Sequence, residues 1–220
     1  MVPPSPLDER ALAASRAAKG FMPEDEGAAL HDAAVAAAEG PFLEVGTYCG
    51  KSAVWLGAAA RRRSTLLFTV DHHRGSQENQ AGWLHHDTEV VDHATGRMDT
   101  LPWFRRTIEA AGLEDCVVAV VGESAEVARW WATPLGFVFI DGGHGDDVVR
   151  ADEAAWLPKV RPGGALAIHD VFADPTDGGR PPYDLWRRCL DSGRWQDAGG
   201  RGSLRILHRT TVLGDGHGQT

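Results

Sequence analysis

The sequence predicts one doubly wound α/β domain, with a seven-stranded, mostly parallel sheet preceded by N-terminal helices. Short apolar runs such as 42–45 and 137–140 alternate with stretches that favour helices, which is typical of parallel strands buried on both faces. The first run passes directly into a loop with two glycines, and a helix-compatible stretch follows at once. The sequence has no internal repeat and no sign of a second domain.

Residues 1–40 are expected to form a helical extension ahead of the sheet. Their alanine-rich stretches, 7–19 and 24–39, contain good helix formers, and a glycine follows each of them, as helix ends favour. We expect these helices to pack on the sheet or on a second copy of the chain. Their alanine-rich faces make a homodimer the expected assembly, and we assign them no chemistry.

Residues 41–210 are expected to form the domain itself, and the glycine-rich residues 211–220 a disordered tail. The expected elements are, in order, strand 42–45, helix 52–62, strand 66–70, helix 101–111, strand 116–121, helix 125–131, strand 137–140, helix 146–157, strand 165–168, helix 183–190 and a last, antiparallel edge strand 203–207. A long polar segment, 71–98, follows the second strand. Loops of this length are usually functional or disordered.

The composition of the chain limits the kinds of partner that it is expected to bind. The formal net charge is −9, which argues against sequence-independent binding of nucleic acid or of an anionic membrane. No apolar stretch approaches the roughly 20 residues that span a bilayer, and the first residues lack the features of a signal peptide. Cys49, Cys116 and Cys189 form neither a metal-ligand pattern nor a disulfide framework, which favours a reducing cytoplasm.

Acidic residues lie at the carboxyl ends of five predicted strands, and they are Glu44, Asp71, Glu123, Asp141 and Asp170. The carboxyl ends of parallel strands share one edge of a sheet, so these residues are expected to converge on a single cleft. An acidic residue at such a place also caps the next helix. Five in succession favour the shared cleft.

The loop after the first strand restricts the ligand of this cleft. Residues 44–50 lack the Lys-Ser/Thr ending of a phosphate-binding loop at its required spacing, and they lack the third glycine of a dinucleotide fingerprint. Glu44 suits a cationic ligand, and Asp71 is placed to accept hydrogen bonds from ribose hydroxyls. A positive centre and a ribose together describe S-adenosylmethionine, a sulfonium with an amino-acid tail.

From about residue 41 to residue 209 the chain resembles the class I S-adenosylmethionine-dependent methyltransferases, whose fold is Rossmann-like. The family's first motif is matched by Glu44-Val45-Gly46 and Gly50, its ribose-binding acid by Asp71, and its adenine segment by Gly122-Glu123-Ser124. The resemblance implies a cofactor-binding set of Glu44, Gly46, Tyr48, Gly50, Ser52, Asp71, His72, Gly122, Glu123, Ser124 and Asp141.

A second resemblance concerns residues 140–144 and 163–170. They are similar to the corresponding segments of metal-dependent O-methyltransferases that act on sugars and natural products, and catechol-type enzymes share the layout. The resemblance implies that Asp141 and Asp170 hold Mg²⁺, or another divalent cation, with His169 at the third ligand position.

The third ligand stays open, because Mg²⁺ prefers oxygen. A water or Asp146 is an alternative, and His169 then orients Asp170 from outside the shell. His144 lies three residues after Asp141, where the catechol-type family carries its general base. A hydroxyl that attacks a sulfonium methyl must lose its proton, and histidine titrates near neutrality. Capping of the following helix is the structural alternative for His144.

The polar segment 71–83 is expected to lie over the cleft and to bind the acceptor, a small molecule or an oligosaccharide. The expected substrate-binding residues are His73, Arg74, Gln77, Asn79, Trp83 and Tyr183. Residues 71–75 and 178–183 resemble those of the mycobacterial sugar 1-O-methyltransferases of methylmannose polysaccharide biosynthesis. This implies an acceptor with the 1-OH of a methylated mannose or short mannoside. A solvated excursion or a dimer contact is the alternative for segment 71–83.

Three other functions stay open at this point. One is an O-methyltransferase of a phenolic or macrolide-type natural product. Another is an iron-dependent hydroxylase, since His144, His169 and Asp141 supply a 2-His-1-carboxylate set. The third is a protein that binds S-adenosylmethionine without turnover.

Overall fold

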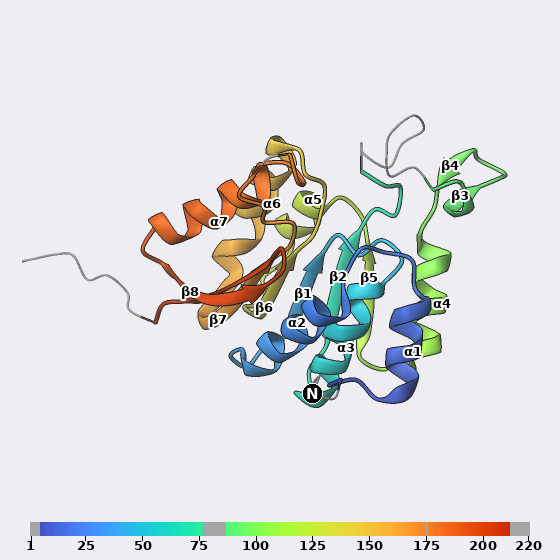
Figure 1. Ribbon diagram of the computed structural model, residues 1–220, viewed down its shortest axis with the longest axis horizontal. Helices are drawn as coiled ribbons and strands as arrows, with labels where there is room; N and C mark the ends of the chain where they lie inside the picture. Colours follow the sequence, from blue (N-terminus) through green and yellow to red (C-terminus); the bar gives the residue numbers. More distant parts are fainter. Residues whose placement is uncertain (1–4, 77–86, 175, 212–220) are drawn as a thin grey trace, which may run out of the picture.

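The structure is a computed structural model that describes residues 5–76, 87–174 and 176–211. Among these residues one seven-stranded sheet has the order β5-β2-β1-β6-β7-β9-β8 (Figure 1). Its strands are β1 (Phe42–Val45), β2 (Leu67–Asp71), β5 (Val117–Val121), β6 (Leu135–Ile140), β7 (Val160–Ile168), β8 (Trp195–Arg201) and β9 (Leu204–Arg209). The pairs from β5 to β7 are parallel, while β9 runs antiparallel to β7 and to β8. The predicted fold class is confirmed.

Helices cover both faces of the sheet (Figure 1). On one face lie α1 (Glu9–Ala17), α2 (Glu24–Ala36), α3 (Lys51–Arg62) and α4 (Leu101–Ala111); on the other lie α5 (Ser124–Arg129), α6 (Asp146–Trp156) and α7 (Pro181–Asp191). Successive residues of a strand point to opposite faces, so Phe42 packs with α3 and Leu43 with the α6 side. This double burial explains why the parallel strands are continuous apolar runs.

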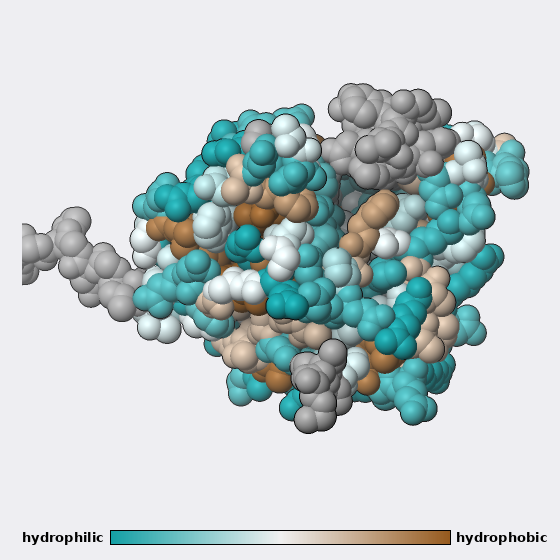
Figure 2. Space-filling view, in the orientation of Figure 1, coloured by the Kyte–Doolittle hydropathy of each residue, from teal (hydrophilic) through white to brown (hydrophobic). Residues whose placement is uncertain are grey.

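The surface drawn in Figure 2 is mainly hydrophilic, with hydrophobic side chains in small separate groups. The large apolar residues lie between the layers, where Trp55, Trp156 and Phe139 are at most 1% exposed. None of the helices in the described residues is both long and apolar enough to span a membrane.

The N-terminal helices pack on this chain's own helices. α1 contacts α3 and α4, and α2 contacts α3 and β8. The alanines of their apolar faces, among them Ala11, Ala14 and Ala34, are buried in the cluster that contains Trp55. The faces on which the expected homodimer rested therefore serve the core of a single chain.

Three features of the sheet differ from the sequence prediction. β8 was not predicted, because it is a polar, glycine-rich strand in which only Trp195 is buried. It lies outside β9, so the strand predicted at 203–207 is antiparallel but does not form the edge. A two-stranded pair, β3 (Val91–Asp92) and β4 (Arg97–Met98), and a 3₁₀ turn at Thr88–Val90 also lie within the segment expected to be a long loop.

Candidate active site

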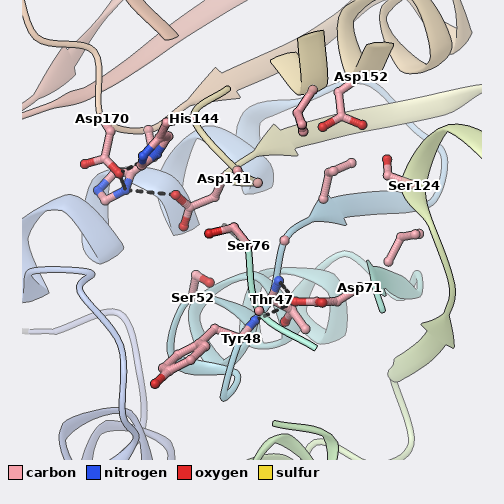
Figure 3. Close-up of a pocket in the computed structure, with 18 of the residues that line it drawn as sticks. Thr47, Tyr48, Ser52, Asp71, Ser76, Ser124, Asp141, His144, Asp152 and Asp170 are labelled. Atoms are coloured by element: carbon pink, nitrogen blue, oxygen red, sulfur yellow. Dashed lines mark hydrogen bonds and ion pairs between the residues drawn. The ribbon is translucent and has the colours of Figure 1, made fainter. Parts of the chain in front are cut away.

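One cavity of about 700 Å³ lies at the carboxyl ends of β1, β2, β5, β6 and β7 (Figure 3). This volume is within the range of small-molecule sites, roughly 300–1,000 Å³. Polar residues from all five strand ends line it: Thr47 after β1, Asp71 and His72 at β2, Glu123 and Ser124 after β5, Asp141 and His144 after β6, and His169 and Asp170 after β7. Four of the five acids expected to converge on one cleft, Asp71, Glu123, Asp141 and Asp170, therefore line this cavity, and Glu44 does not.

Hydrogen bonds connect the loop after β1 to the end of β2. Asp71 Oδ2 accepts the backbone N–H groups of Thr47 and Tyr48, each at 2.9 Å, and its Oδ1 accepts that of His73 at 2.7 Å. An ionised carboxylate has about four acceptor sites, so roughly one stays available on the side that faces the cavity. Asp71 thus shapes the loop and can also accept a ligand hydroxyl.

Gly46 brings this loop against β6. Its φ is +80°, and a Cβ placed there would lie 2.3 Å from the carbonyl oxygen of Asp141. The close approach and the left-handed backbone both require glycine. Gly50, the N-cap of α3, also has a left-handed backbone, with φ +88°, and a Cβ placed there would lie against the ring of Phe104.

Replacing Gly46 with alanine is therefore expected to destabilise the protein more than glycine replacement elsewhere. Gly96 is the matched control, because its φ is +66° and a Cβ added there would have no atom within 4 Å. Gly96→Ala should lower the free energy of unfolding by about 1–2 kcal/mol, and Gly46→Ala by a further ~1–3 kcal/mol from the backbone clash. Urea unfolding measures both; equal losses would show that the contact with Asp141 is unimportant.

Glu44 lies behind the loop and does not line the cavity. It is fully buried and accepts hydrogen bonds from the hydroxyls of Thr47 and Ser52, the latter at 2.6 Å. Burial raises the pKa of Glu44 to about 8. Of the cofactor-binding residues predicted between positions 44 and 52, Gly46, Tyr48 and Ser52 line the cavity, whereas Glu44 and Gly50 do not.

The end of the cavity beside β5 matches the predicted adenine segment and adds one residue to it. Gly122, Glu123 and Ser124 line this end, and the Ser124 hydroxyl accepts the indole N–H of Trp156 at 2.7 Å. Asp152 of α6, which the sequence analysis did not select, lines it as well. Its position was a usable signal, since an aspartate there interrupts the apolar face that Val149 and Trp156 form.

The opposite end of the cavity holds two histidines and two aspartates (Figure 3). His169 Nδ1 lies 3.1 Å from Asp141 Oδ1 and 3.5 Å from Asp170 Oδ2, and His144 Nε2 lies 3.1 Å from Asp170 Oδ2. Asp170 has a φ of +54°, a conformation that costs a non-glycine residue of order 1–3 kcal/mol and recurs at functional sites. Burial alone would raise the pKa of Asp170, but hydrogen bonds from His144 and His169 hold it well below its usual value.

Glu26 of α2 completes this cluster, which corrects the prediction that the N-terminal helices carry no chemistry. Its Oε2 lies 2.6 Å from His169 Nε2, across 143 sequence positions, and its Oε1 accepts the Ser203 N–H at 2.8 Å. The sequence carried no signal for this contact, because acidic residues in a first helical turn also complement the helix dipole. Burial alone lowers the pKa of His169, but Asp141, Asp170 and Glu26 outweigh it and raise the pKa to about 12.

The residues of this end fit a divalent cation. One ligand atom each from Asp141, His169 and Asp170 lies within 4.8 Å of the other two. Glu26 holds His169 Nε2, as carboxylates hold the outer nitrogen of ligating histidines, and this leaves Nδ1 directed at the two aspartates. Asp146, the alternative ligand, is exposed and paired with Arg150 at 2.7 Å, outside this cluster.

Three of the six residues predicted to bind the acceptor, His73, Arg74 and Tyr183, lie in the described part of the chain. His73 is 2% exposed, and its Nδ1 lies 2.8 Å from the Thr100 hydroxyl. Arg74 donates to the Met98 carbonyl, and Tyr183 packs in α7 with Arg180 over its ring. None of the three lines the cavity. Gln77, Asn79 and Trp83 lie outside the described residues.

Other segments supply the walls at this end. Gly75 and Ser76 after β2, and Phe172, Asp177 and Gly178 after β7, line the cavity. Residues 19–22, which connect α1 to α2, also line it, and the Phe21 ring stacks on Tyr48 with centroids 6.3 Å apart. This connection was not predicted to reach the site.

Comparison with known proteins agrees with the fold. Residues 43–171 match a family model described as a methyltransferase domain. A protein from Corynebacterium glutamicum has a similar structure, with a TM-score of 0.66, 17% identity, and coverage of 96% of this chain and 93% of that one.

Two further solved structures are similar to this chain. The O-methyltransferase TomG of Streptomyces achromogenes, involved in tomaymycin synthesis and solved with S-adenosylmethionine, has a TM-score of 0.60 at 19% identity, covering 92% of this chain and 90% of its own. An O-methyltransferase of Bacillus cereus, solved with S-adenosylhomocysteine, has a TM-score of 0.61 at 18% identity, covering 96% and 93%. At such identities the likeness establishes a shared fold.

Proposed function

This chain belongs to the methyltransferase domain family, and on that basis we propose that it transfers the methyl group of S-adenosylmethionine to a hydroxyl oxygen, specifically that of a sugar. One observation carries the proposal. A single cavity joins the loop pinned by Asp71, which suits a ribose, to the cluster of Asp141, His144, His169 and Asp170, which suits the activation of a hydroxyl.

The cofactor would lie along the strand ends. The loop after β1 and Ser52 would hold its methionine part, the free acceptor site of Asp71 its ribose, and the segment from Gly122 to Ser124 its adenine. In this direction the sulfonium would lie near Asp141, which Figure 3 shows between the two ends of the cavity. The methyl carbon is then presented to the end that holds His144.

The chain's own groups would deprotonate and orient the acceptor. A divalent cation held by Asp141, Asp170 and His169 Nδ1 would lower the pKa of a bound hydroxyl when present. His144, whose Nε2 lies 3.1 Å from Asp170 Oδ2, would take the proton of the acceptor hydroxyl. Bound S-adenosylmethionine would supply the methyl group by in-line displacement, in which the carbon–sulfur bond breaks as the carbon–oxygen bond forms and S-adenosylhomocysteine is released. Positioning contributes much of the rate.

A sugar acceptor is supported by the polar lining at this end, where Ser76, His144 and Asp177 offer directional hydrogen bonds. Our narrower proposal, from the sequence resemblance, is the 1-OH of a methylated mannose or short mannoside. Phe21, Met22 and Phe172 line the same cavity and favour the second candidate, a phenolic or macrolide-type acceptor.

An assay of S-adenosylhomocysteine release against panels of both acceptor classes separates the candidates. The proposal expects turnover with sugars in which the 1-OH is free and none when that hydroxyl is blocked. Turnover with phenols alone would replace the sugar by the second candidate. Failure of S-adenosylmethionine to bind would overturn the proposed function itself.

Glu26 is expected to tune the affinity for the cation. Glu26→Gln keeps the shape and an acceptor for Ser203 but removes the charge that holds His169 Nε2, so the Kd for Mn²⁺ should rise by about 10–100-fold. Calorimetry of the cofactor-free protein measures this. Asp25→Asn is the matched control, because the neighbouring Asp25 pairs with Arg201 at the surface. Equal Mn²⁺ affinity in both variants would exclude a role for Glu26.

A further inference from the structure

Asp152 is a buried carboxylate that the proposed reaction does not use. It lies on α6, is 3% exposed and lines the cavity at the end away from His144 and Asp170 (Figure 3). Burial raises its pKa to about 6, and no cation of the described residues offsets that cost. A buried carboxylate without a counter-ion is expensive, so its retention calls for a partner that the chain alone does not supply.

The Ser124 hydroxyl partly satisfies Asp152. Because Ser124 Oγ accepts the indole N–H of Trp156, its one O–H is left to donate to Asp152. This bond occupies one acceptor site of a group that has about four. Further acceptor capacity is therefore left for a donor from the cavity.

The space in front of Asp152 is open. Gly142 faces it, and a Cβ on Gly142 would lie 3.3 Å from Asp152 Oδ2. Ala125 lines the same end with a single methyl group. The carboxylate is thus presented to the part of the cavity that Ser124, Ala125 and Gly142 line, away from His144 and Asp170 (Figure 3).

We propose that Asp152 accepts a hydrogen bond from the 6-amino group of the cofactor's adenine and is the residue that selects an amino-purine. The inference rests on the proposed function, because it takes the direction of the cofactor from Asp71 and His144. In that direction the adenine fills the part of the cavity beside Asp152. The methionine part of the cofactor, which carries its other N–H donors, lies on the far side of the ribose. The exocyclic 6-amino group of the adenine is then the donor that the Asp152 carboxylate lacks.

A double-mutant cycle tests this pairing by calorimetry. The ligands are S-adenosylhomocysteine and its 6-deamino analogue, which carries purine in place of adenine. Wild-type protein should bind the analogue about 10–100-fold more weakly, the range for a hydrogen bond to a charged group. In Asp152→Ala the two ligands should bind within about twofold of each other, and Asp152→Asn should give an intermediate ratio.

Asp147→Ala is the control, since Asp147 is an exposed residue of the same helix and should leave the wild-type ratio unchanged. Thermal unfolding checks that the variants fold. It has its own expectation: the native state holds an extra proton on Asp152 between pH 3.8 and about 6, so wild-type protein should lose stability relative to Asp152→Asn as the pH rises through this range.

The outcomes separate the inference from the function on which it rests. If wild-type protein binds neither ligand, the proposed function fails. If it binds S-adenosylhomocysteine and the deamino analogue equally, or if Asp152→Ala keeps the wild-type ratio, the cofactor site stands and the role of Asp152 is overturned.

Discussion

Replacing His144 with alanine should lower the rate of methyl transfer by about 10²–10⁴-fold, the usual contribution of a positioned general base. His144 lines the cavity, and its Nε2 lies 3.1 Å from Asp170 Oδ2. The loss should appear in kcat, because the hydroxyl must be deprotonated only as the methyl group moves. The affinity for S-adenosylhomocysteine should stay within about twofold, since the cofactor binds at the loop after β1.

His93→Ala is the matched control for this experiment. His93 is exposed in the turn between β3 and β4, outside the cavity, so its loss should change neither kcat nor cofactor affinity. Turnover by His144→Ala within about threefold of wild type would show that another group, or solvent, removes the proton. A loss seen entirely in KM would assign His144 to binding of the acceptor.

Chelation of the divalent cation should have an effect of similar size. Metal-free protein, and the variant Asp141→Asn at saturating cofactor, should lose roughly 100-fold or more in turnover, because several kcal/mol of charge stabilisation are removed and 1.36 kcal/mol corresponds to tenfold. Added Mn²⁺ or Mg²⁺ should restore the chelated wild type but not the variant. Mn²⁺ should bind more tightly, since His169 Nδ1 is a nitrogen donor.

Asp146→Asn separates this effect from a general loss of negative charge. Asp146 lies on the neighbouring helix α6, exposed and paired with Arg150, and its replacement should leave turnover and its metal dependence unchanged. Activity that is indifferent to EDTA would eliminate the metal from the mechanism. The cluster of Asp141, His169 and Asp170 would then hold the acceptor through hydrogen bonds alone.

The parts of the fold that were predictable are those whose signal is local. Buried parallel strands are short apolar runs, and β1 and α4 have the predicted bounds. β8 was not predicted because an edge strand exposed to solvent needs no alternation of apolar and polar residues. Residues such as Gln196 and Asp197 also favour a loop by composition. The β3–β4 pair is too short to leave a periodic pattern.

Some residues of the site were likewise predictable from local sequence, and others were not. Its strand-end residues were predictable, because topology alone brings the ends of parallel strands to one edge. Glu26 was not, since its bond to His169 depends on how α2 packs against β7 and β9. His73 was selected for its chemistry, but a backbone with φ +58° turns its ring inward to Thr100. Side-chain direction after a strand end is a tertiary property that composition does not contain.

A crystal structure with S-adenosylhomocysteine tests the central claim most directly. The account predicts the ligand in the cavity at the strand ends, with a ribose hydroxyl within hydrogen-bond distance of Asp71, the adenine beside Ser124 and the sulfur towards the end that holds His144 and Asp170. A ligand bound elsewhere, or bound in the reverse direction with its adenine at His144, would contradict the assignment of both ends of the cavity.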